Sequence, residues 1–175
     1  MLDKCNPIHL YLHKRHEGFT LLEMMVSISV LAILVALAIP SFSEIMLSSK
    51  LKSYSSYMVS SIYLARGEAL KRNTTINLCV SGDGLKCTAG NWENGWIVLS
   101  RDQVIHRQQA LGKGYKLIEL TGQTDLKFQS SGLLSQPAAF TICRAEPTPG
   151  SHERTVNLSI TARPGVGKTT NGTCP

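Results

Sequence analysis

The sequence predicts an α+β fold in which a long N-terminal α-helix packs on an antiparallel β-sheet domain. Three observations predict it: an apolar run at residues 19–39, an apolar stripe at helical spacing over residues 47–69, and short strand-like segments after residue 74. The 175 residues suit one globular domain with an appendage and are too few for a large enzyme barrel.

The apolar run at residues 19–39 is long enough to cross a bilayer once. Apolar side chains occupy 17 of its 21 positions, and a helix of this length, at about 1.5 Å per residue, reaches roughly 31 Å. Three Lys or Arg side chains precede the run and no comparable cluster directly follows it, which predicts a cytoplasmic amino end and an exported remainder. A cleaved secretory signal ending at Ala36-Leu37-Ala38 is the alternative, but a disposable signal has no use for the costly charge of Glu23.

After Pro40 the apolar residues recur at steps of three and four, which predicts an amphipathic helix that buries one face on a domain. The stripe comprises Leu47, Leu51, Tyr54, Met58, Ile62, Ala65 and Ala69. Arg66, Lys71 and Arg72 lie in the last turns, where the negative end of the helix dipole favours cations. We interpret these cations as solvated side chains at the end of a helix rather than as a DNA-binding site.

Seven short segments after residue 74 have strand patterning and are separated by turn signals. They are Thr75–Val80, Trp96–Arg101, Val104–Gln109, Tyr115–Leu120, Leu126–Gln129, Ala139–Arg144 and Arg154–Thr161. A helix followed by a run of strands favours an antiparallel sheet.

Cysteine usage fits an exported domain. Four cysteines lie in the strand-rich region and its tail, and four permit three pairings. We favour Cys79 with Cys87, across the turn-rich residues 81–84, and Cys143 with Cys174, which would attach the tail to a strand. Zinc binding is the rival use, but no Cys-x-x-Cys pair and no clustered His accompanies these residues.

The charge of the exported part is strongly basic. From Lys50 to the end the sequence has 15 basic and 8 acidic side chains, a formal net charge of +7, within a chain of net charge +6. Such a balance favours a polyanion or an acidic membrane surface as a partner.

Motifs that would indicate catalysis are missing from the sequence. It has no Gly-x-Ser-x-Gly and no His-Glu-x-x-His, and His106 and His152 stand alone. Residues 162–169 satisfy a loose P-loop pattern, but only six residues follow Thr169, so we expect no helix there to present its amino end to a phosphate. We expect no enzyme activity, no cofactor and no bound metal.

The start of the apolar run resembles a known processing signal. Gly18-Phe19-Thr20-Leu21-Leu22-Glu23, followed by the apolar stretch, resembles the class III signal of type IV prepilins and type II secretion pseudopilins. The resemblance implies that a membrane prepilin peptidase cuts after Gly18 and methylates the new amino group of Phe19. It also implies that Glu23 pairs with the amino terminus of a neighbouring subunit during assembly, which fits the need of an intramembrane carboxylate for a cationic partner.

This resemblance implies a division of the chain and a location. The four expected parts are a leader peptide at 1–18, a transmembrane and assembly helix at 19–40, an amphipathic second half of that helix at 41–73, and an extracytoplasmic β-rich head domain at 74–175. The protein would cross the inner membrane once before assembly, and would then belong to a periplasmic or cell-surface pilus.

A second block of residues narrows the resemblance. Residues 79–87 and 91–98, together with the spacing of residues 140–143 before Arg154, look like the GspH/FimT group of minor pilins and pseudopilins. The resemblance implies a type IV pilin-like fold. We interpret Trp92 and Trp96 as core and turn anchors.

A DNA-binding motif is matched only in part. FimT-type members concerned with DNA uptake carry Gly-Arg-x-Arg in a C-terminal loop, and here Arg163 matches its first Arg, whereas Ala162 and Gly165 replace the Gly and the second Arg. Arg154 and Lys168 would add positive charge nearby. Contact of these cations with the phosphates of double-stranded DNA and plain solvation of a surface loop are the two interpretations.

The resemblance therefore implies a minor type IV pilin that supports assembly of the fibre. Its partners would be other pilins or pseudopilins, the prepilin peptidase and the inner membrane, with DNA taken up in natural transformation as a further candidate. A GspH-like minor pseudopilin of a type II secretion system is the alternative, and the basic charge favours a pilus.

Overall fold

The computed structural model describes residues 18–147, 149–150, 152–169 and 174, with side chains at residues 37–41 excluded. Most of the expected leader, residues 1–17, therefore lies outside the described residues. The chain divides into two compact units, Met1–Phe42 and Ser43–Pro175, and helix α1 (Leu21–Arg72) contributes to both. The second unit, Ser43–Pro175, is called the head domain below, and it contains the expected β-rich region at 74–175 together with the second half of α1.

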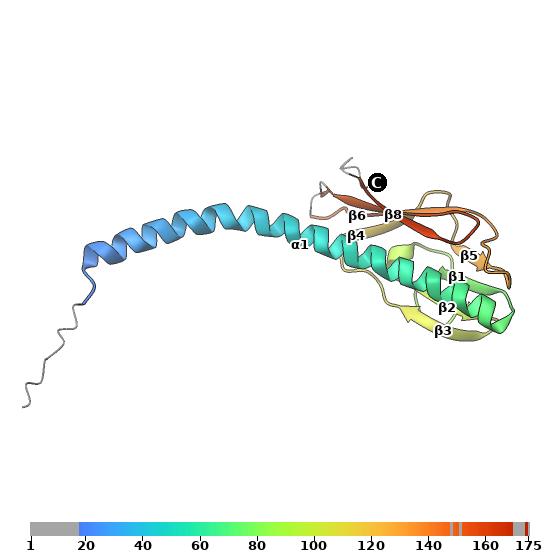
Figure 1. Cartoon of the computed structure of the whole chain (residues 1–175). Coiled ribbons are helices and arrows are strands. Elements are labelled where there is room, and N and C mark those ends of the chain that lie inside the picture. The colour runs from blue at the N-terminus through green and yellow to red at the C-terminus, as the bar shows by residue number, and fades with distance from the viewer. Residues whose placement is uncertain (1–17, 148, 151, 170–173, 175) are drawn as a thin grey trace, which may run out of the picture. The chain divides into compact units, whose positions relative to one another are not determined.

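The head domain contains the second half of α1 and two four-stranded antiparallel sheets (Figure 1). One sheet has the order β3-β2-β1-β5 and the other the order β4-β6-β7-β8. The strands are β1 Ile76–Val80, β2 Trp96–Ser100, β3 Gln103–Gln108, β4 Tyr115–Glu119, β5 Asp125–Phe128, β6 Ala138–Arg144, β7 Glu153–Leu158 and β8 Pro164–Thr169.

All seven expected strands are confirmed, with their starts shifted by no more than one residue. The sequence does not predict that these strands divide between two sheets, because the alternation of apolar residues identifies a strand but not the strand beside it. After β3 the chain passes to the other sheet for β4, returns for β5, and completes the second sheet with β6, β7 and β8.

The sequence does not predict the eighth strand. β8 begins at Pro164 and contains Gly165 and Gly167, which together read as a turn. It pairs with β7 alone, and Pro is tolerated as the first residue of such an edge strand. The expected strand at 154–161 was correspondingly too long, since β7 ends at Leu158 and residues 159–163 make the turn into β8.

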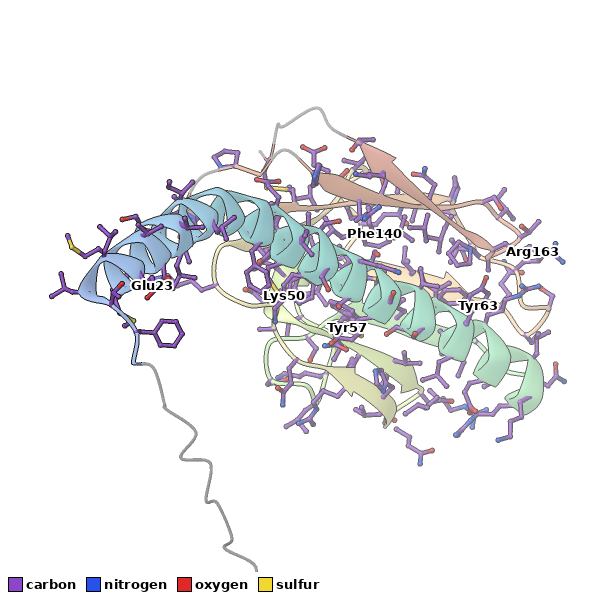
Figure 2. All side chains as sticks on the ribbon, turned by 60° about the vertical axis from the view of Figure 1, so that its left-hand side comes forward. Glu23, Lys50, Tyr57, Tyr63, Phe140 and Arg163 are labelled. Atoms are coloured by element: carbon purple, nitrogen blue, oxygen red, sulfur yellow. A yellow bond between two sulfur atoms is a disulfide. The ribbon has the colours of Figure 1, made fainter. Side chains whose placement is uncertain are left out.

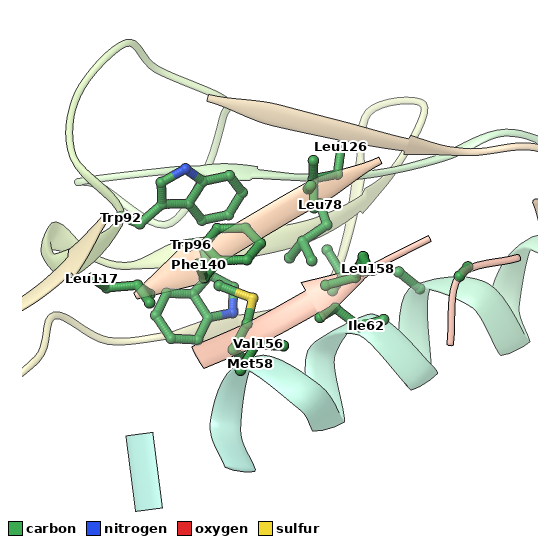
Figure 3. Packing of buried hydrophobic residues seen from close by; sticks show 14 of the residues in the cluster. Met58, Ile62, Leu78, Trp92, Trp96, Leu117, Leu126, Phe140, Val156 and Leu158 are labelled. Atoms are coloured by element: carbon green, nitrogen blue, oxygen red, sulfur yellow. The ribbon is translucent and has the colours of Figure 1, made fainter. Parts of the chain in front are cut away.

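One apolar core joins the helix to both sheets. The seven residues of the predicted stripe on α1, from Leu47 to Ala69, are all buried, which confirms the amphipathic prediction. In Figure 3, Met58 and Ile62 of α1 face Val156 and neighbouring strand residues. Full burial of a side chain of this size contributes about 1.5–3 kcal/mol.

The two tryptophans are core anchors, as the sequence predicts. Trp92 begins a short 3-10 helix, η1 (Trp92–Asn94), and its ring meets Phe140 edge to face at a centroid distance of 5.1 Å. The buried Trp96 opens β2. Gly95 between them has φ +109°, and a Cβ there would lie 2.8 Å from the carbonyl oxygen of Gln108, so this turn requires glycine.

A buried hydrogen bond ties α1 to the first sheet. The indole Nε1 of Trp96 donates to Ser61 Oγ at 2.9 Å, and Ser61 Oγ in turn donates to the carbonyl oxygen of Tyr57 at 3.0 Å. Both side chains are almost completely buried. The pair therefore holds the helix in register with β2, and loss of the Ser61 hydroxyl leaves the buried indole N–H of Trp96 without its acceptor.

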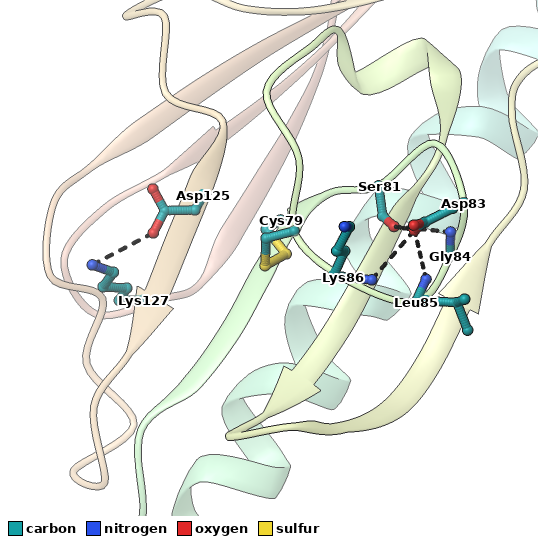
Figure 4. The surroundings of a disulfide bond; sticks show 9 residues. Cys79, Ser81, Asp83, Gly84, Leu85, Lys86, Asp125 and Lys127 are labelled. Carbon is teal, nitrogen blue, oxygen red and sulfur yellow. Dashed lines mark hydrogen bonds and ion pairs between the residues drawn. A yellow bond between two sulfur atoms is a disulfide. The ribbon is translucent and has the colours of Figure 1, made fainter.

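The loop after β1 is closed by a disulfide between Cys79 and Cys87 (Figure 4). Inside the loop, Asp83 Oδ1 accepts hydrogen bonds from the backbone N–H of Leu85 at 2.8 Å and of Lys86 at 3.3 Å. These backbone donors hold the pKa of the Asp83 carboxyl below its ordinary value. The ionised carboxylate is thus part of the folded loop.

We predict that Ser61→Ala lowers the free energy of unfolding by about 1–3 kcal/mol, because the buried indole N–H of Trp96 loses its acceptor. Urea titration of the oxidised protein measures this. Ser60→Ala, at the exposed neighbouring position on α1, is the matched control and should change stability by no more than about 0.5 kcal/mol. Equal effects of the two substitutions would contradict the role of this hydrogen bond.

Acidification tests the Asp83 loop. Because the folded-state pKa of Asp83 is lowered, its contribution to stability is complete above the ordinary pKa of 3.8 and is lost as the pH falls through the lower folded-state value. Asp83→Asn should therefore be less stable than the parent at neutral pH, and the gap should close on acidification below pH 3.8. Thermal unfolding at a series of pH values measures the gap, with Asp102→Asn in the exposed β2–β3 turn as control. A gap that does not depend on pH would refute this account.

Candidate functional site

The first turn of α1 is closed by Thr20 and Glu23. Glu23 Oε2 accepts hydrogen bonds from the backbone N–H and from the hydroxyl of Thr20, each at 2.9 Å, and the Glu23 N–H donates back to Thr20 Oγ1 at 3.2 Å. This reciprocal arrangement is a capping box, which satisfies N–H groups that a helix start leaves free. Thr20-x-x-Glu23 is the sequence signature of that box, and our sequence reasoning did not use it.

The residues around the expected cleavage point are exposed. Phe19 is 82% exposed, and an added Cβ at Gly18 would have no heavy atom within 4 Å. The large apolar side chains that follow, from Leu21 to Val35, are also exposed. Residues 21–35 of α1 therefore form an exposed apolar stretch of helix in the described part of the chain, with the carboxylate of Glu23 in its first turn (Figure 2).

Where side chains are described, none of the helical segments is both long enough and apolar enough to cross a membrane.

The cysteines of the β-rich region are all taken up in disulfide bonds. Besides Cys79–Cys87, the structure joins Cys143 of β6 to Cys174 in the tail, so it contains both pairs that we favoured. A zinc site would need thiolates, which a disulfide does not offer.

The three cations of the candidate DNA site do not form one patch. Arg154 and Lys168 are directly opposite each other in the β7–β8 ladder. Arg163 lies in the turn at the other end of this hairpin, five residues from Lys168 along an extended strand, which is roughly 16 Å. A single cluster of three phosphate contacts is therefore not present in the structure.

Arg154 is also directed toward the helix rather than into solvent. Its Nη2 donates to Ser48 Oγ of α1 at 3.2 Å, while its Nε is buried without a hydrogen-bond partner. Two residues earlier, His152 Nε2 lies 3.7 Å from Glu44 Oε2 of α1. These contacts hold the start of β7 against α1, so the role of Arg154 in this structure is to stabilise the head domain. Arg163 and Lys168, by contrast, are exposed to solvent.

The stretch that matched a loose P-loop pattern has the wrong structure for a phosphate cradle. Lys168 and Thr169 lie in β8, and Thr169 Oγ1 donates to Glu153 Oε2 of β7 at 3.0 Å. A phosphate cradle requires a loop leading into a helix amino end, so the exclusion of this motif by the sequence agrees with the fold.

A cavity of about 280 Å³ lies between η1, β4 and the turn after β4. Its charged groups have partners within the domain. Lys116 Nζ lies 3.1 Å from Glu93 Oε1, and the buried Glu119 carboxylate accepts the backbone N–H groups of Thr121 and Gln123, each at 2.8 Å. Glu119 thus shapes the turn, and no sequence signal that we used pointed to it.

Comparison with solved structures finds the same fold. The minor pilin FimU of Pseudomonas aeruginosa strain PAO1, in two crystal forms, matches with TM-scores of 0.56 and 0.51. The identities are 18% and 20%, and the matches cover 69% and 67% of this chain and 90% and 92% of the other. The minor pseudopilin EpsH of the type 2 secretion system of Vibrio cholerae has a TM-score of 0.46 at 16% identity, over 71% of this chain and 99% of that one. Comparison with curated proteins found no match.

Two family models match the sequence. Residues 13–39 match the prokaryotic N-terminal methylation motif. The matched range includes Gly18 and Phe19, where cleavage and methylation are expected. Residues 57–162, more than half of the chain, match the family described as type II transport protein GspH. With its long helix and antiparallel sheets, the chain belongs to the GspH family of type IV pilin-like proteins.

Proposed function

We propose that this protein is a minor type IV pilin that helps to build a pilus. It is made as a precursor that crosses the inner membrane once with its amino end in the cytoplasm. A prepilin peptidase cuts between Gly18 and Phe19 and methylates Phe19, and the processed subunit enters the fibre with the head domain outside. Its task is assembly rather than chemical turnover.

The observation that carries this proposal is the exposed apolar helix beginning at the methylation motif. The large apolar side chains from Phe19 to Val35 are exposed among the residues that the structure describes, although such side chains are normally buried in a soluble protein. Lipid and then a bundle of neighbouring helices would cover them in turn. The head domain, by contrast, has a buried apolar core of its own.

Glu23 is the assembly carboxylate in this proposal. Within the subunit its Oε2 is held by Thr20, but none of these contacts is a cation. A carboxylate moved into an apolar helix bundle needs a positive partner, and the processed amino terminus of a neighbour provides one. The capping box would keep the carboxylate at the first turn of α1, ready for that contact.

A minor pseudopilin of a type II secretion system is the alternative, since it would use the same signal, anchor and head. The experiment that separates them is deletion of the gene followed by two assays. Loss of surface pili with normal export of secreted enzymes supports the pilin, whereas normal pili with failed export supports the pseudopilin.

Substitution of Glu23 separates charge from capping. Gln completes a capping box as Glu does but carries no charge, whereas Ala does neither. We predict that Glu23→Gln and Glu23→Ala both abolish incorporation into purified fibres, measured by immunoblot, while precursor processing continues. Ser27→Ala, one turn along α1, is the matched control and should incorporate normally. Normal incorporation of Glu23→Gln would show that the charge is not required, and failure of Glu23→Ala beside it would assign the effect to the helix cap.

Contact with DNA stays a prediction, and the structure changes its expected form. Because Arg163 lies in the turn before β8 and Lys168 near the far end of β8, each would contact a separate phosphate. If the protein binds DNA through this hairpin, Arg163→Ala and Lys168→Ala should each reduce the slope of log K against log salt by about one, and the double variant by about two. Fluorescence anisotropy over a salt series measures this. Lys52→Ala, an exposed cation on α1, is the control, and an equal effect there would leave only nonspecific attraction.

A further inference from the structure

Three exposed apolar side chains lie on the end of the head domain at which α1 ends. Leu70 is 50% exposed, Leu133 41% and Ile160 54%. They come from three separate segments: the last turns of α1, the loop between β5 and β6, and the turn between β7 and β8. We call these three residues the end patch.

Two contacts show that these three segments lie against one another. A Cβ added to Gly132 would lie 3.0 Å from Cδ2 of Leu70, so the loop before Leu133 rests on the helix end. The next residue, Leu134, donates its N–H to the carbonyl oxygen of Ile160 at 2.8 Å. The end patch is therefore one surface built by the fold, unlike apolar residues scattered singly over a protein.

Two cations, Lys71 and Arg163, belong to the segments that carry the end patch. Lys71 follows Leu70 directly, and Arg163 closes the turn that carries Ile160; Figure 2 shows Arg163 at the end of the domain where α1 ends. Glu68 is already engaged by both Lys71 and Arg72, and this engagement, led by the hydrogen bond from Arg72, holds its pKa below the ordinary value. Arg163 is exposed and makes no hydrogen bond or ion pair with the described residues. The surface thus combines an apolar centre with one exposed guanidinium, that of Arg163, beside it.

We propose that the end patch docks the head of a different subunit of the same fibre, through an apolar surface edged by carboxylates. This inference rests on the proposed function as a fibre subunit. Apolar centres with a charged rim are typical of protein interfaces, and charge complementarity at the rim selects the partner. A second copy of this chain is a poor occupant, because pairing of two end patches would add a second Arg163 and no carboxylate that is free to pair with it.

DNA is a less suitable occupant of this surface than protein. A DNA site needs several cations free to contact phosphates, whereas Lys71 and Arg72 here share Glu68. The centre of the patch is aliphatic, and the stacking of bases on a protein surface uses aromatic side chains. The geometry instead leaves aliphatic area and one free guanidinium, which suit a carboxylate-edged protein surface.

The test is photocrosslinking in cells that assemble the fibre. The full chain carries p-benzoyl-L-phenylalanine at residue 133, and in a separate strain at residue 85, where the native Leu85 is 64% exposed in the Cys79–Cys87 loop. We expect a product at residue 133 that joins the chain to another fibre subunit, with product at residue 85 lower by about tenfold. Mass spectrometry should locate the partner site within an apolar surface bordered by Asp or Glu.

Two variants test the chemistry of the contact. The double variant Leu70→Ser with Ile160→Ser should reduce the residue-133 product by about tenfold, as expected when the centre of an interface is removed. Arg163→Glu should reduce it severalfold, and exchange of the partner's crosslinked carboxylate for Lys should restore it. Leu85→Ser is the matched control and should leave the yield unchanged.

The outcomes separate this inference from the proposed function. Presence of the protein in purified fibres, with product at residue 133 no higher than at residue 85, overturns the docking surface and leaves the proposed function standing. A product with a second copy, a product with DNA, or a partner surface without carboxylates overturns it as well. Absence of the protein from fibres overturns both, because the proposed partner is a fibre subunit.

Discussion

Burial of one face of α1 is the constraint on which the head domain depends. The stripe from Leu47 to Ala69 supplies the helix side of a single core, and neither sheet closes that core without it. Each sheet buries one face against the same helix, so eight strands in two sheets share one apolar interior. The hydrogen bond between Ser61 and Trp96 adds direction to this packing, since apolar contact alone does not fix how far a helix slides along a sheet.

Local patterns in the sequence predicted what depends on local chemistry. The helical spacing of the α1 stripe and the apolar alternation in the strands identified these elements, because both signals depend only on residues a few positions apart in the sequence. The partition into two sheets was not predictable in this way, since it depends on which strands meet across long connections. β8 was missed because Pro164 and its glycines lack strand propensity, and pairing with β7 decides its conformation instead.

The same distinction holds for the candidate sites. Glu23 stands in a short linear motif, so its position at the start of a helix followed from the sequence, and even its partner Thr20 was readable as a capping box. Of the three cations near the C-terminus, Arg163 is separated from Arg154 and Lys168 by the length of a hairpin. Arg154 is engaged by Ser48, more than 100 residues earlier. The net charge of the head domain therefore does not predict which part of its surface a polyanion would contact.

The bond between Cys143 and Cys174 turns the end of the chain into a covalent ring that includes β7 and β8. In the pilus proposed above, the subunit would meet extracellular proteases, and the exposed turn between these strands is an accessible place for a cut. A single cut inside the ring opens it without releasing either piece, so the strands stay tethered and can pair again. Damage at this hairpin thus becomes permanent only after a second cut or after reduction of the disulfide.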